Sequence, residues 1–316
     1  MSGGAGGRLG RRVVLLAGGT GGAKLAVGLE QALEPGALTV IANPGDDCDV
    51  WGLRVCPDLD AVLFRLAGIF NQASGFGVAG DTFSTHGMMS RLGEPDWFWL
   101  GDRDLALHIL RTSLLQQGLR LSQVGLELGR RLGVQSRVIP VTDDQVRTRF
   151  TTSAGELDFQ EYFVRERLAP RLLGVRFVGL ETARPSPEAL DAVRGADLVV
   201  IGPSNPVISI APLLSVLKGH LRPQTCLAIS PIVGGRALKG PTVEMMSALG
   251  LEPTPLGVAR EYRGVAGWYV LDRLDQELEA QIRGLGFKVL ITDTVMEDDM
   301  ASQRLAEHVL GGLGAA

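Results

Sequence analysis

Short, uninterrupted apolar runs alternate along the chain with longer stretches in which apolar residues recur every three to four positions. The runs Val13–Ala17 and Leu38–Ala42 are of strand length and lack polar alternation, which is typical of parallel strands covered on both faces. Further strands are predicted at 137–141, 146–151, 197–201, 225–230 and 288–292. Because helical stretches separate them, the pattern predicts an α/β fold with a Rossmann-like, doubly wound, mostly parallel sheet.

The stretch from about 58 to 132 is mainly helical in its pattern. Apolar residues recur there at helical spacing over 59–70, 105–115 and 121–132. No repeat or low-complexity linker divides the chain, so we expect one domain over 13–316 with this helical insertion beside the sheet. Residues 1–12 are rich in Gly and Arg and predict a flexible tail.

Composition and charge narrow the class of protein. The 316 residues, 45% of them hydrophobic, can form a large core, and a formal net charge of −4 gives no basic surplus for nucleic acid. The run Val13–Ala17 is far shorter than the roughly 20 residues that cross a bilayer. Three cysteines without C-x-x-C spacing indicate reduced thiols. We therefore expect a cytoplasmic protein with small-molecule partners and no nucleic-acid or membrane partner.

A glycine-rich segment, 18–24, follows the first predicted strand and opens a helix. Glycines let the backbone approach a ligand closely, and the free N–H groups of a helix N-terminus suit phosphate oxygens. The segment fits neither the P-loop nor the dinucleotide fingerprint, and no acidic residue ends the second strand, which disfavours a nucleotide-dependent oxidoreductase. The alternative is a purely structural turn. The residues expected to bind phosphate are Gly18, Gly19, Thr20, Gly21, Gly22 and Lys24.

Four carboxylates, Asp46, Asp47, Asp58 and Asp60, lie on two loops that follow the second strand. Open α/β sheets bind ligands at this edge, and hard oxygen ligands of this kind suit Mg²⁺ during transfer at a diphosphate. We expect metal or substrate contact from Asp46 and Asp60. Asp47 is a candidate substrate contact or a solvated turn residue, and the simpler interpretation of Asp58 is a helix N-cap.

Eight short motifs carry a resemblance to a known family. They are GGTGGAK at 18–24, NPGDD at 43–47, PDLDAV at 57–62, GDTF at 80–83, LGDRD at 100–104, IGPSNP at 201–206, SPIVG at 230–234 and KGP at 239–241. In this order they resemble the 2-phospho-L-lactate transferases of coenzyme F420 biosynthesis, over nearly the whole chain. The stretch PDWF at 95–98 is similar to bacterial members, which use phosphoenolpyruvate.

The resemblance implies a Mg²⁺-dependent phosphotransferase reaction. The terminal ribityl hydroxyl of the deazaflavin Fo attacks a phosphorylated acid that is joined through a diphosphate to guanosine. GMP leaves, and the product is F420-0 or its dehydro form. The acid is phospholactate, phosphoenolpyruvate or 3-phosphoglycerate, and the sequence leaves the choice open. The resemblance also implies a homodimer.

Matched positions imply roles for particular residues. Asp46 and Asp60 resemble the metal-side carboxylates, and Arg103 resembles a residue near Fo and the diphosphate. From chemistry alone, Arg103 could simply pair with a neighbouring aspartate, and the loop after the strand at 197–201 could be a rigid turn between two prolines. The residues of that loop implied to face guanosine are Gly202, Ser204 and Asn205.

The loop after the aspartate pair departs from the family pattern. The residues Cys48-Asp-Val-Trp51 stand where bacterial relatives have an aromatic residue and a histidine. Asp49 could alter metal binding or acid selection, and Trp51 could stack on the deazaflavin. Related nucleotide-sugar-binding regulators share the fold and the glycine-rich opening but have a Gly-Ser-rich segment here. A non-catalytic regulator of that kind is the alternative function.

Other aromatic and imidazole side chains are given structural interpretations. Residues 97–99 are predicted to pack in the core, with a wall of a Fo pocket as the alternative. The four histidines have no ligand spacing, so surface or helix-cap roles are expected for His86, His108, His220 and His308.

Overall fold

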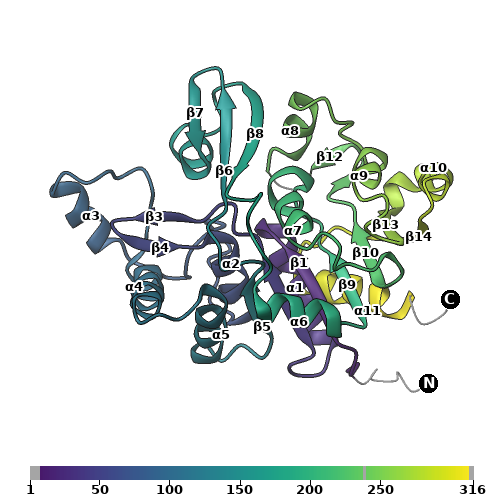
Figure 1. Ribbon diagram of the computed structural model, residues 1–316, viewed down its shortest axis with the longest axis horizontal. Helices are drawn as coiled ribbons and strands as arrows, with labels where there is room; N and C mark the ends of the chain where they lie inside the picture. Colours follow the sequence, from purple (N-terminus) through teal and green to yellow (C-terminus); the bar gives the residue numbers. More distant parts are fainter. Residues whose placement is uncertain (1–7, 238–239, 313–316) are drawn as a thin grey trace.

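A parallel sheet forms the centre of the computed structural model, which describes residues 8–237 and 240–312. From β1 the sheet extends one way through β2 and β5 and the other way through β9, β10, β13 and β14 (Figure 1). All neighbouring strands are parallel, so the doubly wound prediction is confirmed. The strands are β1 (Val13–Ala17), β2 (Leu38–Ala42), β5 (Arg137–Pro140), β9 (Leu198–Ile201), β10 (Cys226–Ile229), β13 (Trp268–Asp272) and β14 (Lys288–Thr292).

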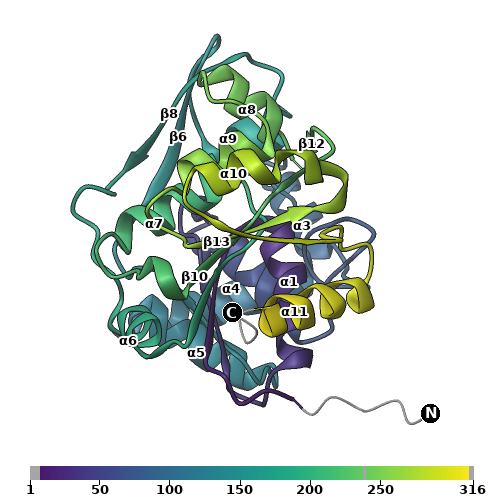
Figure 2. The same cartoon turned by 90° about the vertical axis from the view of Figure 1, so that its right-hand side faces the viewer.

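Helices cover both faces of this sheet, which explains why its strands are apolar throughout. Val13 and Leu15 pack into one core cluster, with α1 (Gly19–Ala32), α2 (Pro57–Leu66) and α11 (Asp299–Gly312). Val14 and Leu16 face the opposite cluster. Helices on that second face are α6 (Pro187–Gly195), α7 (Ala211–Val216), α8 (Thr242–Ala248), α9 (Pro255–Glu261) and α10 (Glu279–Gly284). Figure 2 shows α11 beside α1.

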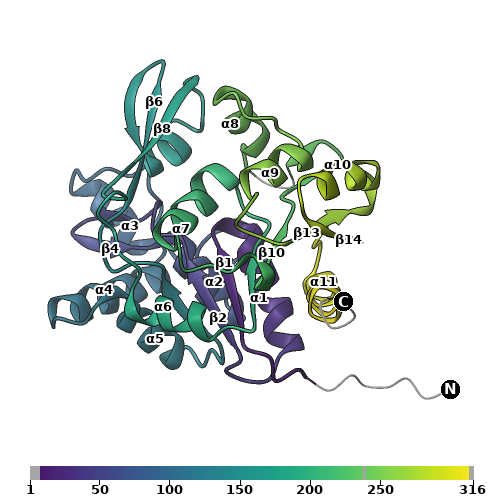
Figure 3. The ribbon, with the colours of Figure 1, turned by 45° about the vertical axis from the view of Figure 1, so that its right-hand side comes forward.

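One predicted strand belongs to a different sheet. The segment 146–151 forms β6 (Arg147–Thr152), which pairs antiparallel with β7 (Gly155–Asp158) and β8 (Leu172–Val178). Its side chains alternate between buried and exposed, as in a sheet covered on one face. Figures 1 and 3 show this small sheet rising from one edge of the molecule near α8. The sequence patterns missed β8 and also β13.

The predicted helical stretch contains the helices expected there. After the hairpin of β3 (Cys48–Val50) and β4 (Leu53–Val55) come α2, α3 (Ser84–Arg91), α4 (Asp102–Gln116) and α5 (Leu121–Arg131). The hairpin and α3 lie at the end of the molecule farthest from β14 (Figure 1). Short turns and bridging strands complete the fold: η1 (Glu161–Arg165), η2 (Pro206–Ile210), η3 (Pro223–Thr225), η4 (Arg273–Leu278), β11 (Ile232–Val233) and β12 (Arg236–Ala237).

The predicted tail is paired with the domain before β1 begins. Residues 1–7 lie outside the described residues. The N–H of Leu9 donates to the carbonyl of Ala32 at 3.1 Å, and its carbonyl accepts from Glu34 at 3.0 Å. Within the described ranges, no helix combines the length and apolar character that a bilayer span requires.

Candidate active site

The glycine-rich loop meets the loop after β9 where the strand order reverses, at the carboxyl edge of the sheet. The N–H of Gly18 donates to Ser204 Oγ at 3.3 Å. A Cβ on Gly21 would lie 2.1 Å from the carbonyl oxygen of Pro203, and one on Gly22 would lie 2.7 Å from the Cβ of the last β1 residue. These glycines are therefore required for close packing between two loops, as well as for any approach to a ligand.

A protein carboxylate already lies at the N-terminus of α1. Gly19, at φ +62°, begins the helix and donates its N–H to Asp58. The other oxygen of Asp58 accepts from Asn43 Nδ2 at 3.0 Å. The residue before α2 that serves as its N-cap is Cys56, so the prediction of Asp58 as a helix N-cap is wrong. Asp58 instead ties the start of α1 to the end of β2.

Two of the predicted ligand-binding side chains are engaged inside the protein. Lys24 Nζ donates to the carbonyl of Met296 at 2.5 Å. Asn205 Oδ1 accepts from the N–H groups of Val207 and Ile208 at 2.9 and 3.3 Å. The rigid-turn alternative therefore describes the side chain of Asn205, and also that of Ser204, which accepts from the glycine-rich loop. Gly202 donates its N–H to the carbonyl of the fourth β1 residue at 3.0 Å.

A cavity of about 530 Å³ opens beside the first turn of α1. Gly19, Thr20, Asp58 and Asp60 line it on the polar side, and aromatic rings line it elsewhere. The prediction that residues 97–99 pack in the core is wrong, because all three line this cavity and Trp99 is 54% exposed. An aromatic wall next to carboxylates and helix amides suits a ligand that joins a flat ring to a charged group.

Asp46 is a buried carboxyl that pairs with no cationic side chain of the described residues. It is 4% exposed, and its Oδ1 has no hydrogen-bond partner in the part of the chain that the structure describes. Burial, followed by the charges of Asp58 and Asp47, raises the pKa of Asp46 well above its usual range. Gln160 Nε2 holds the Asp46 carbonyl at 2.9 Å. The position thus favours a bound cation.

Asp47 is buried too, so the solvated-turn alternative is wrong. Burial raises the pKa of Asp47 to about 7, although Arg54 at 3.3 Å and the thiol of Cys56, which donates to it, act in the opposite direction. Burial also raises the pKa of Asp58 to about 6, against the hydrogen bonds from Asn43 and Gly19. Among the described residues, the guanidiniums of Arg54 and Arg111 pair with Asp47 and Asp60, whereas Asp46 and Asp58 have no cationic partner.

Asp60 is bonded to Arg111, a residue that the sequence patterns missed. Arg111 is fully buried, and its two terminal nitrogens donate to the two oxygens of Asp60, with Nη1 to Oδ2 at 3.1 Å. His108 lies against Arg111 and faces Asp104 at 3.2 Å. The surface or cap role predicted for His108 is wrong, because it is 1% exposed. One sequence signal could have pointed to Arg111 and His108. Asp104, His108 and Arg111 are spaced by four and three positions, which places them on one face of a helix.

Arg103 lies elsewhere. Its N–H donates to Asp81 Oδ1 at 2.8 Å, and its Nη1 donates to the carbonyl of Ala79 at 3.0 Å. The side chain is exposed and is not among the residues that line the cavity. Its guanidinium is therefore bound to the neighbouring loop and, among the described residues, pairs with neither of the flanking aspartates; its place near Fo stays a prediction.

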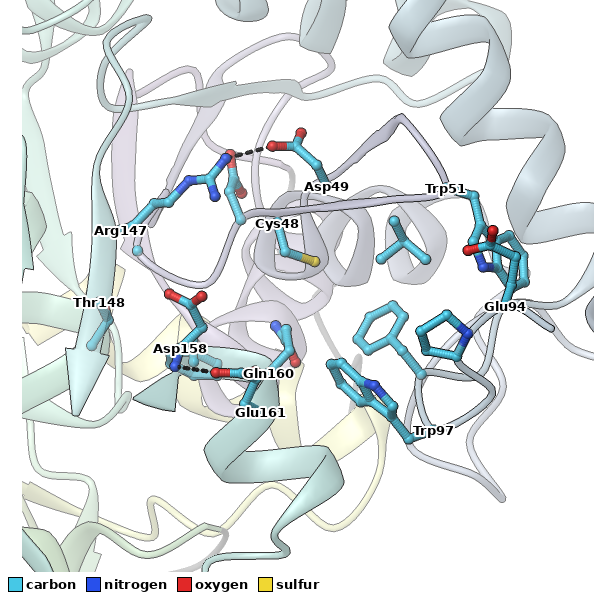
Figure 4. A pocket seen from close by; sticks show the side chains of 16 residues that line it. Cys48, Asp49, Trp51, Glu94, Trp97, Arg147, Thr148, Asp158, Gln160 and Glu161 are labelled. Atoms are coloured by element: carbon cyan, nitrogen blue, oxygen red, sulfur yellow. Dashed lines mark hydrogen bonds and ion pairs between the residues drawn. The ribbon is translucent and has the colours of Figure 1, made fainter. Parts of the chain in front are cut away.

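A second cavity of about 270 Å³ holds the residues that depart from the family pattern (Figure 4). Cys48, Asp49 and Trp51 line it, and Asp49 pairs with Arg147 at 2.5 Å. The two cavities share Trp97, the residue after it, and Gln160. Trp51 therefore lies beside, and not within, the larger cavity.

His86, for which a surface or cap role was also predicted, is buried. Its ring centroid lies 5.9 Å from that of Trp51 and 5.1 Å from that of Trp99. The surface prediction is therefore wrong for His86, which joins the aromatic groups of the two cavities.

A doubly wound sheet with helix amides and carboxylates at its switch point defines a phosphate- or nucleotide-dependent enzyme of Rossmann-like fold. The comparisons are more specific. The model of the family described as 2-phospho-L-lactate transferase CofD matches residues 13–303, and the chain belongs to this family. Its role as a transferase of coenzyme F420 biosynthesis, implied by the motifs, is confirmed.

Relatives named as 2-phospho-L-lactate transferases and as phosphoenolpyruvate transferases are similar to this chain along nearly their whole length. A 2-phospho-L-lactate transferase of Methanopyrus kandleri is 41% identical over 306 residues, covering 95% of this chain and 96% of the relative. A phosphoenolpyruvate transferase of Streptomyces avermitilis is 37% identical over 309 residues, covering 95% of this chain and 97% of the relative. These identities favour the transferase over the regulator.

A solved structure supports the fold. The crystal structure of a UPF0052 family member from Bacillus halodurans aligns with a TM-score of 0.59 at 16% identity, covering 96% of this chain and all of the other.

Proposed function

We propose that this chain transfers a phosphorylated acid from its guanosine diphosphate adduct to the ribityl hydroxyl of Fo and releases GMP. The observation that carries the proposal is the 530 Å³ cavity, which joins an aromatic wall to a carboxylate cluster and the start of α1. A deazaflavin is a flat ring with a polar ribityl chain, and the donor brings a diphosphate. The cavity offers each part a surface of matching chemistry.

In this proposal the ring of Fo lies against the wall formed by residues 97–99. The diphosphate lies at the first turn of α1, where Thr20 lines the cavity. Guanosine lies beside the loop after β9 and contacts its backbone, because the side chains of Ser204 and Asn205 are already bonded. The acid then lies toward the smaller cavity, which residues 48–51 line.

The residues present fit Mg²⁺, which the family resemblance implies. Asp46 Oδ1 has no hydrogen-bond partner among the described residues, and the charges of Asp58, Asp47 and Asp60 act on this carboxyl. Asp60 accepts from Arg111, yet a carboxylate has about four lone-pair sites and can also face a cation. Asp46 and Asp60 would hold the metal, which supplies neutralisation of charge on the diphosphate oxygens.

The transfer needs no covalent enzyme intermediate. The hydroxyl oxygen forms a bond to the phosphorus on the acid side, and the bond from that phosphorus to the bridging oxygen breaks. The electron pair leaves with GMP, and the hydroxyl proton is released. The chain supplies orientation and charge stabilisation, which are the main contributions of enzymes to phosphoryl transfer. A cytoplasmic homodimer belongs to the same proposal.

The decisive experiment is product formation from defined substrates. Purified protein with Mg²⁺ and Fo receives guanosine diphosphate adducts of phospholactate, phosphoenolpyruvate and 3-phosphoglycerate, and mass spectrometry detects the phosphodiester and GMP. We expect one adduct to be preferred. Asp46→Asn should lower kcat by about 10³-fold. Asp191→Asn, at an exposed position of α6, is the matched control. No product with any adduct would sink the proposal.

A further inference from the structure

Four neighbouring side chains contact one another in series, beginning and ending at residues that line the cavity. Asp104 lies 3.2 Å from His108 Nε2, and His108 Nδ1 lies 3.1 Å from Arg111 Nη1. Arg111 then holds Asp60 through both terminal nitrogens. Three of the four residues lie on α4, and Asp60 lies on α2.

The contacts fix the protonation of the imidazole. A guanidinium has donors and no acceptor, so the His108 nitrogen that faces Arg111 must be the unprotonated one. The ring hydrogen is therefore on Nε2, which lies 3.2 Å from Asp104 Oδ1 without the geometry of a hydrogen bond. Arg111 therefore supplies the guanidinium charge that faces Asp60.

The arrangement separates the residues that face substrate from those that hold them. Asp60, Asp104 and His108 line the 530 Å³ cavity, whereas the fully buried Arg111 does not. Arg111 also donates to the carbonyl of Arg54 at 3.2 Å, which anchors it to the hairpin next to the aspartate loop. The planar guanidinium of Arg111 donates to Asp60, to the His108 ring and to the Arg54 carbonyl. It is therefore fixed in place, and the Asp60 carboxylate that it holds can rotate little.

We propose that Arg111 and His108 are positioning residues for the transfer: they fix Asp60 in the orientation in which its remaining lone pairs face the metal and the diphosphate. The inference rests on the proposed function and adds two residues to it. Outer partners of this kind orient ligating carboxylates, and their loss costs about 10–100-fold in metal affinity or activity. Asp104 faces the ring of His108 at 3.2 Å and makes no hydrogen bond to it, so the positioning role is assigned to Arg111 and His108 alone.

Graded substitutions test the proposal. Arg111→Lys keeps the charge but loses the fork, and should lower kcat by about 10–100-fold with less than about a threefold change in the KM for Fo. His108→Asn keeps an acceptor for Arg111, whereas His108→Phe keeps none. Activity should therefore fall in the order wild type, His108→Asn, His108→Phe. Wild-type kcat in Arg111→Lys and His108→Phe would overturn the proposal.

Measurements without turnover separate positioning from folding. Calorimetric titration with Mg²⁺ should show weaker binding to Arg111→Lys by about tenfold or more. Arg130→Lys is the control, because Arg130 makes a two-bond contact with Glu127 on the exposed face of α5. Equal Mg²⁺ binding by Arg111→Lys and wild type, or a loss of kcat that only follows the unfolded fraction in circular dichroism, would contradict the proposal.

Nitrogen NMR of histidine-labelled protein tests the geometry directly. The His108 resonances, identified by their absence in His108→Asn, should show the Nε2–H tautomer at neutral pH. An Nδ1–H tautomer would overturn the arrangement. If the wild type forms no product from any adduct, the proposed function fails, while unchanged Mg²⁺ binding or the wrong tautomer would separately defeat the positioning role.

Discussion

The cavity has two walls that are built in different ways. The sheet wall consists of Gly19 and Thr20, which line the cavity. Behind them the glycine-rich segment packs closely on the loop after β9, with Gly21 against the Pro203 carbonyl. The insertion wall contains Asp60, Asp104 and His108, and side-chain contacts with the buried Arg111 behind it hold Asp60 and His108 in place. The first wall is sensitive to any added carbon, and the second is sensitive to any change of charge.

The difference shows how each wall is stabilised. On the sheet wall, helix amides and glycines offer a surface for an anion, and the carboxylate of Asp58 takes one of those amides in this structure. On the insertion wall, one buried guanidinium offsets the charge of Asp60. Asp46 lines neither cavity but lies close enough to Asp47, Asp58 and Asp60 for their charges to raise its pKa, and its Oδ1 has no hydrogen-bond partner among the described residues. Substitutions should therefore have opposite effects on stability at Asp46 and at Asp60.

The largest effect is expected on the insertion wall. Asp60→Asn leaves the buried charge of Arg111 without its partner, so the free energy of unfolding should fall by about 3–5 kcal/mol, and transfer should be lost. Asp46→Asn removes an uncompensated carboxyl and should raise the free energy of unfolding by about 1 kcal/mol while transfer is lost. Urea denaturation without Mg²⁺ measures the free energy of unfolding of both variants. Equal changes in the two variants would contradict the expected difference between Asp46 and Asp60.

The next effect breaks the sheet wall by steric conflict. Gly21→Ala places a Cβ 2.1 Å from the Pro203 carbonyl and should destabilise the protein by about 3 kcal/mol. The control is Gly87→Ala within α3, where a Cβ meets no atom within 4 Å and the helix should gain about 0.5–1 kcal/mol. Thermal unfolding of both variants measures the difference, and a neutral Gly21→Ala would show that the two loops separate easily.

The pH dependence of stability should reveal the carboxylate that joins the walls. The folded protein raises the pKa of Asp58 to about 6, so its contribution is fully present below the unfolded pKa and is lost as pH rises through 6. Without Mg²⁺, stability should therefore fall between about pH 4 and pH 7. In Asp58→Asn that fall should be smaller by about 2 kcal/mol. Urea denaturation midpoints measured from about pH 4 to pH 7 test this prediction. If the midpoint of Asp58→Asn falls with pH as steeply as that of the wild type, the raised pKa of Asp58 is contradicted.

The smallest effect concerns the aromatic wall. Trp99→Ala removes a half-exposed ring that lines the cavity, so the fold should lose less than about 1 kcal/mol. Binding of the deazaflavin should weaken by about tenfold, as expected for one lost aromatic contact. Fluorescence titration with Fo measures this. Leu92→Ala, at another exposed apolar position, serves as the control and should bind Fo as the wild type does.

Sequence patterns predicted the sheet well because buried parallel strands require continuous apolar runs. They failed for the segment at 146–151, whose alternating pattern indicates a one-sided sheet, and for β13, which pairs between β10 and β14. In the site, motifs located the loops and the carboxylates. They did not predict that Lys24 and Asn205 bond within the protein or that Arg103 lies away from the cavity.

The sequence by itself determined six of the seven strands of the central sheet, the glycine positions and the set of carboxylates, because these depend on local periodicity, backbone freedom and residue type. Only the tertiary structure decided which charges meet. Asp60 and Arg111 are separated by 51 positions, and their contact exists because α2 and α4 contribute side chains to the same core cluster. Burial, which depends on the whole fold, then turns that contact and the unpaired Asp46 into the features that define the site.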